Sequence, residues 1–258
     1  MSEKKIACIT GATSGIGKSC AFAFAGAGFH LILTGRRREL LNSIKRQLED
    51  DYSVQVLTMV MDVRDRQAVE SALSGLEDDW KHIDVLVNNA GLALGLTDIG
   101  DGDPGQWDQM IDTNIKGLLY VSRCIIPGMI NRQSGHIINI GSIAGREAYP
   151  KGNVYCATKS AVDALSRGMR MDLLPHGIKV SQVSPGATET EFSLVRFQGD
   201  EKRAKNVYSG FTPLEPDDIA QAVLFVASLP SHANVDDLLI MPTRQANATM
   251  IYRQEQRQ

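Results

Sequence analysis

The sequence is poor in the residues that build metal sites and disulfide frameworks. Its 258 residues include only four cysteines and five histidines. Cys8, Cys20, Cys124 and Cys156 lie far apart, with no Cys-x-x-Cys pair and no histidine at ligand spacing. Scattered cysteines of this kind are typical of small buried apolar side chains. We therefore expect neither a disulfide nor a metal centre.

Long apolar runs and a strong charge imbalance are also missing. No segment approaches the roughly 18 apolar residues needed to span a bilayer, and residues 1–5 lack the long apolar core of a signal peptide. The formal net charge of -3 gives no reason to expect nucleic acid or an anionic membrane as a partner. We expect a cytoplasmic protein without either partner.

Short β-branched runs alternate with longer amphipathic segments along the whole chain. The predicted strands are 5–10, 30–34, 54–60, 83–88, 135–140, 179–183 and 238–241, and the predicted helices are 17–27, 37–50, 65–80, 106–131, 152–174 and 216–228. Strict alternation of strand and helix implies βαβ crossovers and a parallel sheet. We predict an α/β fold: a single-domain, Rossmann-type doubly wound parallel sheet of about seven strands with helices on both faces.

Proline and glycine predict where some of these elements end. Pro127-Gly128 should end or kink the helix at 106–131, and Pro175-His176-Gly177 should stop the helix at 152–174. The stretch 185–213 is long for a connection. We predict a substrate lid at about 186–214, with a disordered surface loop as the alternative, and a C-terminal tail at about 242–258.

The first predicted strand leads directly into a glycine-rich turn and then a helix. The turn reads Thr10-Gly11-Ala12-Thr13-Ser14-Gly15-Ile16-Gly17. Glycines let backbone N–H groups approach a pyrophosphate, and a helix N-terminus offers unpaired donors and a positive dipole. The spacing differs from the Gly-x-Gly-x-x-Gly fingerprint, so a plain glycine-rich turn is the alternative. We predict that a dinucleotide binds here, at Gly11, Thr13, Ser14, Gly15, Ile16 and Gly17.

The second predicted strand ends at Thr34-Gly35 and is followed at once by Arg36-Arg37-Arg38. An NAD-preferring site places an acidic residue near here, about 20 residues beyond the glycine turn, to bind the ribose hydroxyls. Glycine replaces that acid, and a guanidinium suits a 2′-phosphate. A solvated helix start is the alternative, although cations are unfavourable at a helix N-terminus. We predict NADP(H) as the cofactor, with Arg36 as the principal contact and Arg37 as an assistant.

One predicted helix carries a tyrosine and a lysine one turn apart. Their i, i+4 spacing places Tyr155 and Lys159 on the same face. Lowering a phenol pKa by three units requires about 4 kcal/mol, and a unit charge about 4 Å away supplies that much at an effective dielectric near 20. Lys159, helped by an oxidised nicotinamide, can therefore make Tyr155 an acid/base. Ser142, just past the strand 135–140, can hydrogen-bond a substrate oxygen.

Tyr-x-x-x-Lys alone occurs by chance in many helices, whereas the ordered combination of motifs is far more specific. The chain contains, in order, the glycine-rich turn, Asn88-Asn89-Ala90-Gly91, Asn114, Gly141-Ser142, Tyr155-x-x-x-Lys159 and Pro185-Gly186. Together these motifs resemble the short-chain dehydrogenase/reductase family over nearly the whole chain. The resemblance implies an NADP-dependent oxidoreductase that acts on CH–OH groups.

The resemblance also implies roles for individual residues. Tyr155 would be the acid/base, Lys159 would bind the nicotinamide ribose and lower the tyrosine pKa, and Ser142 would orient the substrate. Asn114 would hold a water that links Lys159 to a proton path. The other implied cofactor contacts are Asp62 and Val63 at the adenine, then Asn88, Ala90 and Gly91, and finally Pro185, Gly186, Thr188 and Thr190 around the nicotinamide.

Segments 142–150, 190–197 and 241–245 narrow the resemblance to the NADP-dependent 3-hydroxy acid dehydrogenases. Those enzymes are tetramers that oxidise serine, L-allo-threonine and related acids at the 3-hydroxyl. A carboxylate substrate needs a cationic anchor, best supplied by a bidentate arginine. Arg146, four residues past Ser142, and Arg196, in the expected lid, are the candidates. Either could instead be a surface charge or part of a structural ion pair.

Self-association is expected from the helices 106–131 and 152–174, which are apolar on more than one face. Core packing is the alternative for these residues, and the resemblance favours a homotetramer. Two further functions compete with a 3-hydroxy acid dehydrogenase. One is a general carbonyl reductase of neutral ketones, aldehydes or 3-oxoacyl thioesters; the other is a binding protein that senses NADP(H) without turnover.

Overall fold

Seven parallel strands form one sheet across residues 5–254, the part of the chain that the computed structural model describes. The strand order is β3-β2-β1-β4-β5-β6-β7. The strands are β1 (Ile6–Ile9), β2 (His30–Gly35), β3 (Val56–Val60), β4 (Ile83–Asn88), β5 (His136–Ile140), β6 (Lys179–Pro185) and β7 (Asp237–Ile240). The predicted fold class is confirmed. The charged start (residues 1–4) and the end of the expected tail (255–258) lie outside the described residues.

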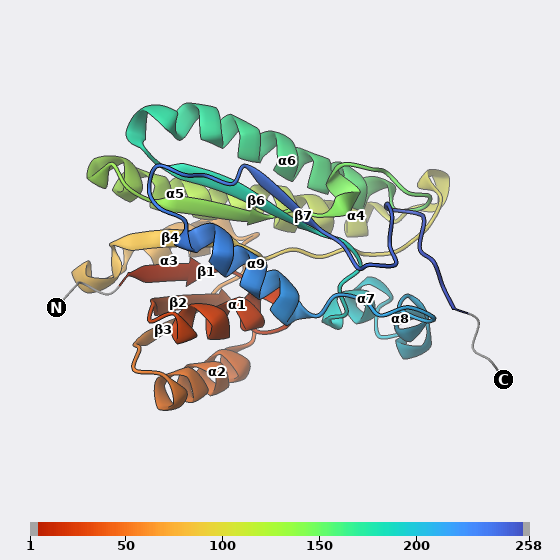
Figure 1. Cartoon of the computed structure of the whole chain (residues 1–258), viewed down its shortest axis with the longest axis horizontal. Helices are drawn as coiled ribbons and strands as arrows, with labels where there is room; N and C mark the ends of the chain where they lie inside the picture. Colours follow the sequence, from red (N-terminus) through yellow and green to blue (C-terminus); the bar gives the residue numbers. More distant parts are fainter. Residues whose placement is uncertain (1–4, 255–258) are drawn as a thin grey trace.

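Helices cover both faces of the sheet. Figure 1 shows α5 and α6 on one side and α1, α2 and α9 on the other. The bounds are α1 (Gly15–Gly26), α2 (Arg38–Asp51), α3 (Arg66–Ser74), α5 (Leu118–Arg132), α6 (Asn153–Leu173) and α9 (Pro216–Ser228). Successive residues of β1 pack in opposite directions: Ile9 joins the core under α1, and Cys8 joins the core under α5. A strand buried on both faces needs a continuously apolar sequence, which Ile6–Ile9 has.

The segment that we predicted as one helix at 106–131 is divided into three. It begins at α4 (Pro104–Ile111), where the Asp103 side chain accepts a hydrogen bond from the N–H of Gly105. A π-helical turn, Asp112–Gly117, separates α4 from α5. Pro127 does not end α5, which continues to Arg132 and closes at Gln133 in the left-handed region (φ 52°). Burial of Ile125 and Met129 on either side of the proline offsets the hydrogen bond that proline cannot donate.

Two other predicted segments have different internal structure. The helix predicted at 65–80 stops at Ser74, because Gly75 follows it and ends the turn, and a short 3₁₀ turn, Asp78–Trp80, comes later. The stretch 185–213 is not a plain loop. It contains α7 (Glu191–Arg196) and α8 (Glu201–Asn206), each begun by a side-chain cap, from Thr190 and Asp200 respectively.

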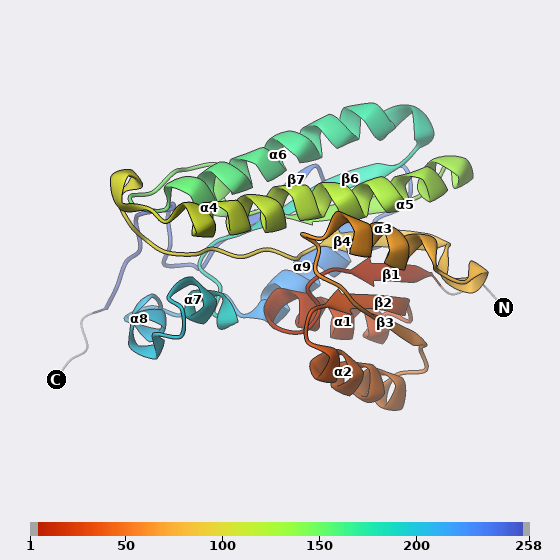
Figure 2. The same ribbon diagram turned by 180° about the vertical axis from the view of Figure 1, so that it is seen from behind.

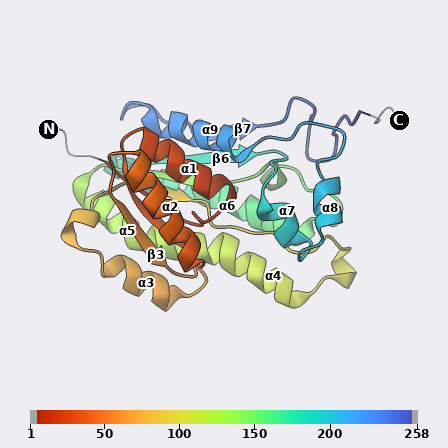
Figure 3. The same ribbon diagram turned by 90° about the horizontal axis from the view of Figure 1, so that it is seen from below.

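The helices α7 and α8 lie outside the layered part of the molecule. Figures 2 and 3 show them side by side beyond one end of the sheet, next to the last described residues. The C-terminal segment contacts the residues that flank these helices, since the N–H of Gln254 donates to the carbonyl of Gly210 (2.8 Å) and Gln245 Oε1 accepts from the N–H of Ala187 (2.8 Å). The segments expected to form a lid and a tail therefore pack on each other.

The order of the strands determines where a ligand can bind. β1 pairs with β2 on one side and with β4 on the other, so the chain reverses its direction of winding at β1. In open α/β sheets, ligands bind outside the carboxyl ends of the strands at such a switch point. Within residues 5–254, no helix is both long and apolar enough to cross a membrane, and no three His, Cys, Asp or Glu side chains gather as metal ligands.

Candidate active site

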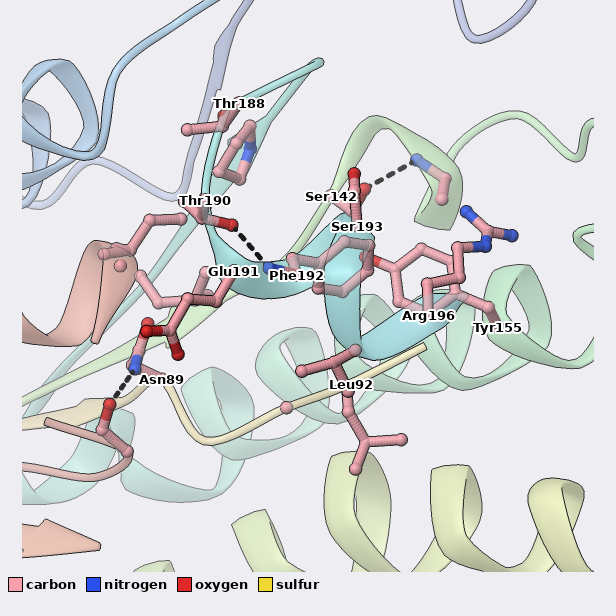
Figure 4. A pocket seen from close by; sticks show the side chains of 18 of the residues that line it. Asn89, Leu92, Ser142, Tyr155, Thr188, Thr190, Glu191, Phe192, Ser193 and Arg196 are labelled. Carbon is pink, nitrogen blue, oxygen red and sulfur yellow. Dashed lines mark hydrogen bonds between the residues drawn. The ribbon is translucent and has the colours of Figure 1, made fainter. Parts of the chain in front are cut away.

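A cavity of about 570 Å³ lies at the carboxyl ends of the strands, between the glycine-rich turn and α7. Pockets that bind cofactors and small ligands commonly have about 300–1,000 Å³. The cavity runs from Arg36 after β2, past Gly15 at the start of α1, to Tyr155 on α6 and Phe192 on α7. Figure 4 shows Ser142, Tyr155, Phe192 and Arg196 together in one part of it. The cavity thus joins the glycine-rich turn to the predicted catalytic group.

The glycine-rich turn is shaped for close approach to a ligand. Gly11 and Gly15 have positive φ values, 67° and 50°, which favour glycine. A Cβ on Gly17 would lie 2.4 Å from the carbonyl oxygen of Gly11, so only glycine fits there. At the start of α1, the Ser14 side chain caps none of the described backbone N–H groups, and the first turn carries no acidic residue. These free donors fit a pyrophosphate.

The arginines after β2 lie at the far end of the cavity from Tyr155. Arg36 and Arg37 both line the cavity and are exposed. Arg37 donates to Thr13 Oγ1 (2.9 Å) and pairs with Glu191 Oε2 (3.0 Å), so it joins the glycine-rich turn to the first residue of α7. Among the described residues, the side chain of Arg36 forms no hydrogen bond or ion pair, so its guanidinium is available to an anion. The arrangement fits the 2′-phosphate of NADP(H).

Asp62 and Val63, expected at the adenine, also line the cavity. The carboxylate of Asp62 accepts from Arg64 Nη2 at 2.6 Å. The hydrogen bonds from Arg64 hold the pKa of Asp62 below its usual value. Val63 packs against Gly117, where a Cβ would lie 2.6 Å from Val63 Cγ2. The π-helical turn, which ends at Gly117, therefore packs against Val63 at the adenine end of the predicted cofactor site.

Ser142, Tyr155 and Lys159 converge on the other end of the cavity. Ser142 lies just after β5, and its Oγ accepts a hydrogen bond from the N–H of Ala144 (3.1 Å). Tyr155 and Lys159 lie on α6, one turn apart, and both are buried. Lys159 Nζ donates to the carbonyl oxygen of Ile140 (2.8 Å), which fixes the ammonium against the end of β5.

The electrostatics of this group differ from our expectation in one respect. Burial raises the pKa of Tyr155, while a hydrogen bond with Ser142 and the charge of Arg196 act in the opposite direction. Burial also lowers the pKa of Lys159 to about 8. The desolvation of the phenol thus outweighs the protein groups that favour the phenolate. A bound oxidised nicotinamide would supply a further positive charge that lowers the Tyr155 pKa.

Asn114 lies behind the cavity wall instead of lining it. It belongs to the π-helical turn, and its side-chain amide donates to the carbonyl of Leu92 (2.8 Å) and to Thr158 Oγ1 (3.0 Å). A Cβ on Gly91 would lie 3.3 Å from Asn114 Oδ1 and 3.6 Å from Lys159 Nζ. Gly91 therefore leaves an opening between the amide and the ammonium, which is where the water of the expected proton path would have to fit.

The two candidate arginines have different surroundings. Arg146 forms an ion pair with Asp237 on β7 and is not among the described residues that line the cavity. This ion pair favours the alternative that the sequence left open for Arg146, a structural ion pair. Arg196 does line the cavity, and Nε and Nη1 donate to the carbonyl of Gly95 (3.1 Å) and the Tyr149 hydroxyl (2.9 Å). Its buried Nη2 has no partner among the described residues.

Most predicted cofactor contacts line the cavity, and two lie behind it. Gly17 packs under the glycine-rich turn, and the side chain of Asn88 is buried, donating to Asn139 Oδ1 (2.9 Å) and Ser122 Oγ (2.9 Å). The predicted residues that line the cavity are Gly11, Thr13, Ser14, Gly15, Ile16, Arg36, Arg37, Asp62, Val63, Ala90, Gly91, Tyr155, Lys159, Pro185, Gly186, Thr188 and Thr190.

Two aromatic side chains at the site were not predicted from the sequence. Tyr149 binds Arg196, and the ring of Phe192 lies with its centre 5.4 Å from that of Tyr155. Tyr149 precedes a proline just before a helix, and Phe192 follows the helix cap Thr190. Tyr149 thus lies in a loop and Phe192 in the first turn of α7, and nothing in the sequence pattern placed either side chain beside Tyr155.

Comparison with known proteins defines the class. A family model described as short chain dehydrogenase matches residues 5–200, so the chain belongs to that family. The NADP-dependent 3-hydroxy acid dehydrogenase YdfG of Salmonella typhimurium is 46% identical over 244 residues, 94% of this chain and 97% of the relative. Sulfoacetaldehyde reductase 2 of Chromohalobacter salexigens is 46% identical over 242 residues, 93% of this chain and 95% of the relative.

Among solved structures, the closed form of serine dehydrogenase complexed with NADP+ has 43% sequence identity and a TM-score of 0.90. The match covers 97% of this chain and 100% of that one. The family resemblance and the Rossmann-type fold expected from the sequence are confirmed.

Proposed function

We propose that this protein is an NADP(H)-dependent oxidoreductase that transfers hydride between the nicotinamide and the 3-hydroxyl carbon of a small 3-hydroxy acid. The relatives named 3-hydroxy acid dehydrogenase and serine dehydrogenase support both the coenzyme and the substrate class. The single observation that carries the substrate class is the unpaired, buried Nη2 of Arg196 in the same cavity as Ser142 and Tyr155.

The coenzyme site is built from the chain's own groups. The N–H groups at the start of α1 would hold the pyrophosphate, and Arg36 with Arg37 would hold the 2′-phosphate. Lys159 would bind the nicotinamide ribose. When bound, NADP+ supplies the hydride acceptor and a positive charge beside the phenol.

Proton transfer is assigned to Tyr155. The hydroxyl of the substrate would bind between Ser142 and Tyr155, and the phenolate would take the hydroxyl proton as hydride leaves the carbon. Ser142 would hold the substrate oxygen and stabilise charge that develops on it. In the reductive direction, Tyr155 would return the proton to the alkoxide. Asn114 and Lys159, on either side of Gly91, would hold the water through which Tyr155 exchanges its proton with solvent.

Arg196 would anchor the carboxylate of the substrate. Arg196 is half-buried, and leaving its buried Nη2 unpaired is costly unless a ligand satisfies it. Gly95 and Tyr149 hold Nε and Nη1. Nη2 is covered by protein in this structure, so binding a carboxylate would turn the guanidinium toward the cavity that the residue lines. A small anionic aldehyde is the second candidate substrate, because one relative that is 46% identical to this chain is named sulfoacetaldehyde reductase 2. A sulfonate could accept a hydrogen bond from the same Arg196 donor.

Steady-state kinetics with a substrate panel test this function. We expect turnover of serine, L-allo-threonine or 3-hydroxyisobutyrate with NADP+ and a much lower kcat/KM with NAD+. Sulfoacetaldehyde with NADPH tests the second candidate. Little activity on these anions, together with strong reduction of neutral ketones or 3-oxoacyl thioesters, would assign the protein as a general carbonyl reductase. Binding of NADPH with no turnover of any substrate would support a sensing role.

We also propose a cytoplasmic homotetramer in which residues 186–214 act as a lid and residues 242–258 as a tail. Most of the apolar side chains on α5 and α6 that suggested self-association are used in the core, including Val121 and Val162. Other large apolar side chains are exposed, such as Met171 (69%), Leu174 (74%) and Phe225 (55%), and association would cover them. Light scattering coupled to gel filtration measures the mass; a monomer at micromolar concentration would contradict the tetramer.

A further inference from the structure

A line of polar side chains crosses four neighbouring strands beneath the active site. In the register of the sheet, Asn88 on β4 lies opposite Asn139 on β5, Asn139 lies opposite Gln182 on β6, and Gln182 lies opposite Asp237 on β7. Asn88, Asn139 and Gln182 are buried, with at most 5% of each residue exposed. Polar residues at these positions contrast with the apolar side chains that fill the rest of the core.

Hydrogen bonds connect this line from one end to the other. Asn88 Nδ2 donates to Asn139 Oδ1, and Asn139 Nδ2 donates to Ser166 Oγ on α6, both at 2.9 Å. Ser166 Oγ has one proton, which it shares between the nearer carbonyl of Val162 (2.7 Å) and Gln182 Oε1 (3.3 Å).

Beyond Gln182 the line continues to the edge of the sheet. Gln182 Nε2 donates to Ser184 Oγ (2.9 Å), and Ser184 Oγ donates to Asp237 Oδ1 (3.2 Å). The other oxygen of Asp237 pairs with Arg146. The network therefore runs from the cofactor end of β4, past the helix that carries Tyr155, to the segment after Ser142.

The network touches the chain on both sides of Ser142. On the N-terminal side, a Cβ on Gly141 would lie 2.8 Å from Gln182 Cδ and 2.8 Å from Ser184 Oγ, so the backbone rests directly on these two side chains. On the C-terminal side, Arg146 closes the short turn that begins at Ser142 and is held by Asp237. The segment that carries the serine hydroxyl is thus fixed at both ends to the same network.

Stabilising the sheet alone would not require this network of polar side chains. Apolar residues of similar volume hold parallel sheets at least as well, whereas hydrogen-bonded polar side chains fix one arrangement. Asn88 Oδ1, at the far end, has no partner among the described residues. Gln182, Ser184 and Asp237, at the Ser142 end, are all paired. We propose that Gln182, Ser184 and Asp237 are positioning residues that hold the Ser142 hydroxyl in place relative to Tyr155. The proposal rests on the proposed function in one respect, that Ser142 acts on the substrate oxygen.

A double-mutant cycle on Asp237 and Ser142 tests the proposal. Asp236 provides the matched control, because it is the preceding residue and pairs with Arg170 (3.2 Å) on α6 instead of Arg146. We expect Asp237→Ala to lower kcat by about 3- to 10-fold, with the Kd for NADPH within twofold of wild type. In a Ser142→Ala background the same substitution should change kcat by less than twofold. Asp236→Ala should change kcat by less than twofold in both backgrounds. Thermal unfolding verifies that each variant is folded.

A second readout does not depend on turnover. Ser142 lowers the pKa of Tyr155 through a hydrogen bond, so displacement of Ser142 should raise that pKa. Ultraviolet titration of the tyrosinate in the NADP+ complex, with Tyr155→Phe to identify the signal, should show a rise for Asp237→Ala and for Ser142→Ala but not for Asp236→Ala.

Two results would overturn the proposal. One is that Asp237→Ala and Asp236→Ala change kcat and the Tyr155 pKa equally. The other is that Asp237→Ala lowers kcat in the Ser142→Ala background as much as it does in the wild-type background. Failure of the proposed function is distinguishable from these results. If the wild-type protein fails to oxidise hydroxy acids, the substrate class is wrong, and the tyrosinate titration still decides the positioning role.

Discussion

The guanidinium carbon of Arg196 lies 5.7 Å from the ring centre of Tyr155, although the two residues belong to separate elements, α7 and α6. Phe192, also on α7, packs against the same ring. The segment expected to be a lid therefore contributes a cation and an aromatic side chain to the wall around the phenol. Residues of this segment influence both what the site binds and how the phenol titrates.

Replacing Arg196 by alanine should impair acids selectively. Hydrogen bonds to charged groups contribute about 1.5–3 kcal/mol, so we expect the KM for hydroxy acids to rise about 10- to 100-fold. The kcat/KM for neutral ketones should change less than about threefold. Arg146→Ala is the control, because Arg146 pairs with Asp237 outside the cavity. This variant should not raise the KM for acids more than the KM for neutral substrates. Equal losses on acids and neutral substrates in Arg196→Ala would remove Arg196 as the anchor.

Replacing Tyr155 by phenylalanine should abolish turnover while the coenzyme still binds. The substitution removes the hydroxyl that exchanges the proton but keeps the ring that packs on Phe192. General acid–base catalysis contributes about 10²- to 10⁴-fold, so we expect kcat to fall at least a hundredfold. Fluorescence titration with NADPH should give a Kd within about threefold of wild type. Appreciable residual turnover would mean that another group transfers the proton.

The choice between NADP(H) and NAD(H) should depend on Arg36. Arg36 lines the cavity, whereas Arg38, at the start of α2, is not among the described cavity residues and serves as the matched control. We expect Arg36→Ala to weaken NADP(H) binding by about 10- to 100-fold, the value of one or two charge-assisted contacts. Binding of NAD(H) should change little in either variant. If Arg38→Ala had the same effect, the result would reflect general surface charge.

The buried Lys159 should make stability depend on pH. Its folded-state pKa of about 8 lies below its ordinary value near 10.4, so at pH 7 the folded protein bears a desolvation cost on the order of 3 kcal/mol. Lys159→Met removes that cost and loses one hydrogen bond to Ile140, so the variant should be about 1–3 kcal/mol more stable at pH 7. Above pH 8 the folded state releases the proton before the unfolded state does, so wild-type stability rises with pH.

Urea unfolding of both proteins without coenzyme at pH 7 and pH 10 measures this effect. The advantage of Lys159→Met should shrink between these pH values. Both proteins contain the same six tyrosines, so the contribution of these residues cancels in the difference. A variant that is less stable than wild type at both pH values would show that packing and the hydrogen bond outweigh the buried charge.

Much of the fold could be predicted because the relevant signals are local. The apolar run in β1 and the glycines that follow it determine a buried strand, a tight turn and a helix start within residues 6–17. The family motifs placed Ser142, Tyr155 and Lys159 correctly around one cavity. The π-helical turn at Asp112–Gly117 and the persistence of α5 through Pro127 could not be predicted, because burial against the sheet decides them.

At the site, the features that the sequence left open depend on contacts between distant parts of the chain. The partner of Arg146 is Asp237, far away in the sequence, so its role as an ion pair became visible only in the folded chain. The phenol pKa depends on how completely Tyr155 is desolvated, and sequence spacing gives only the distance to Lys159. Arg196 was identified as one of two alternatives, and the folded structure distinguished it by leaving one nitrogen unpaired.

The Arg37–Glu191 ion pair has a consequence for how the coenzyme is exchanged. It links the segment after β2 to the start of α7, and both residues line the part of the cavity where the adenosine half would bind. Both side chains are about half exposed (44% and 52%), so separating them costs less than about 1 kcal/mol, and dissolved ions weaken the contact further. Separating Arg37 from Glu191 thus requires little free energy. If this separation accompanies release of the coenzyme, the dissociation rate of NADPH should increase with ionic strength.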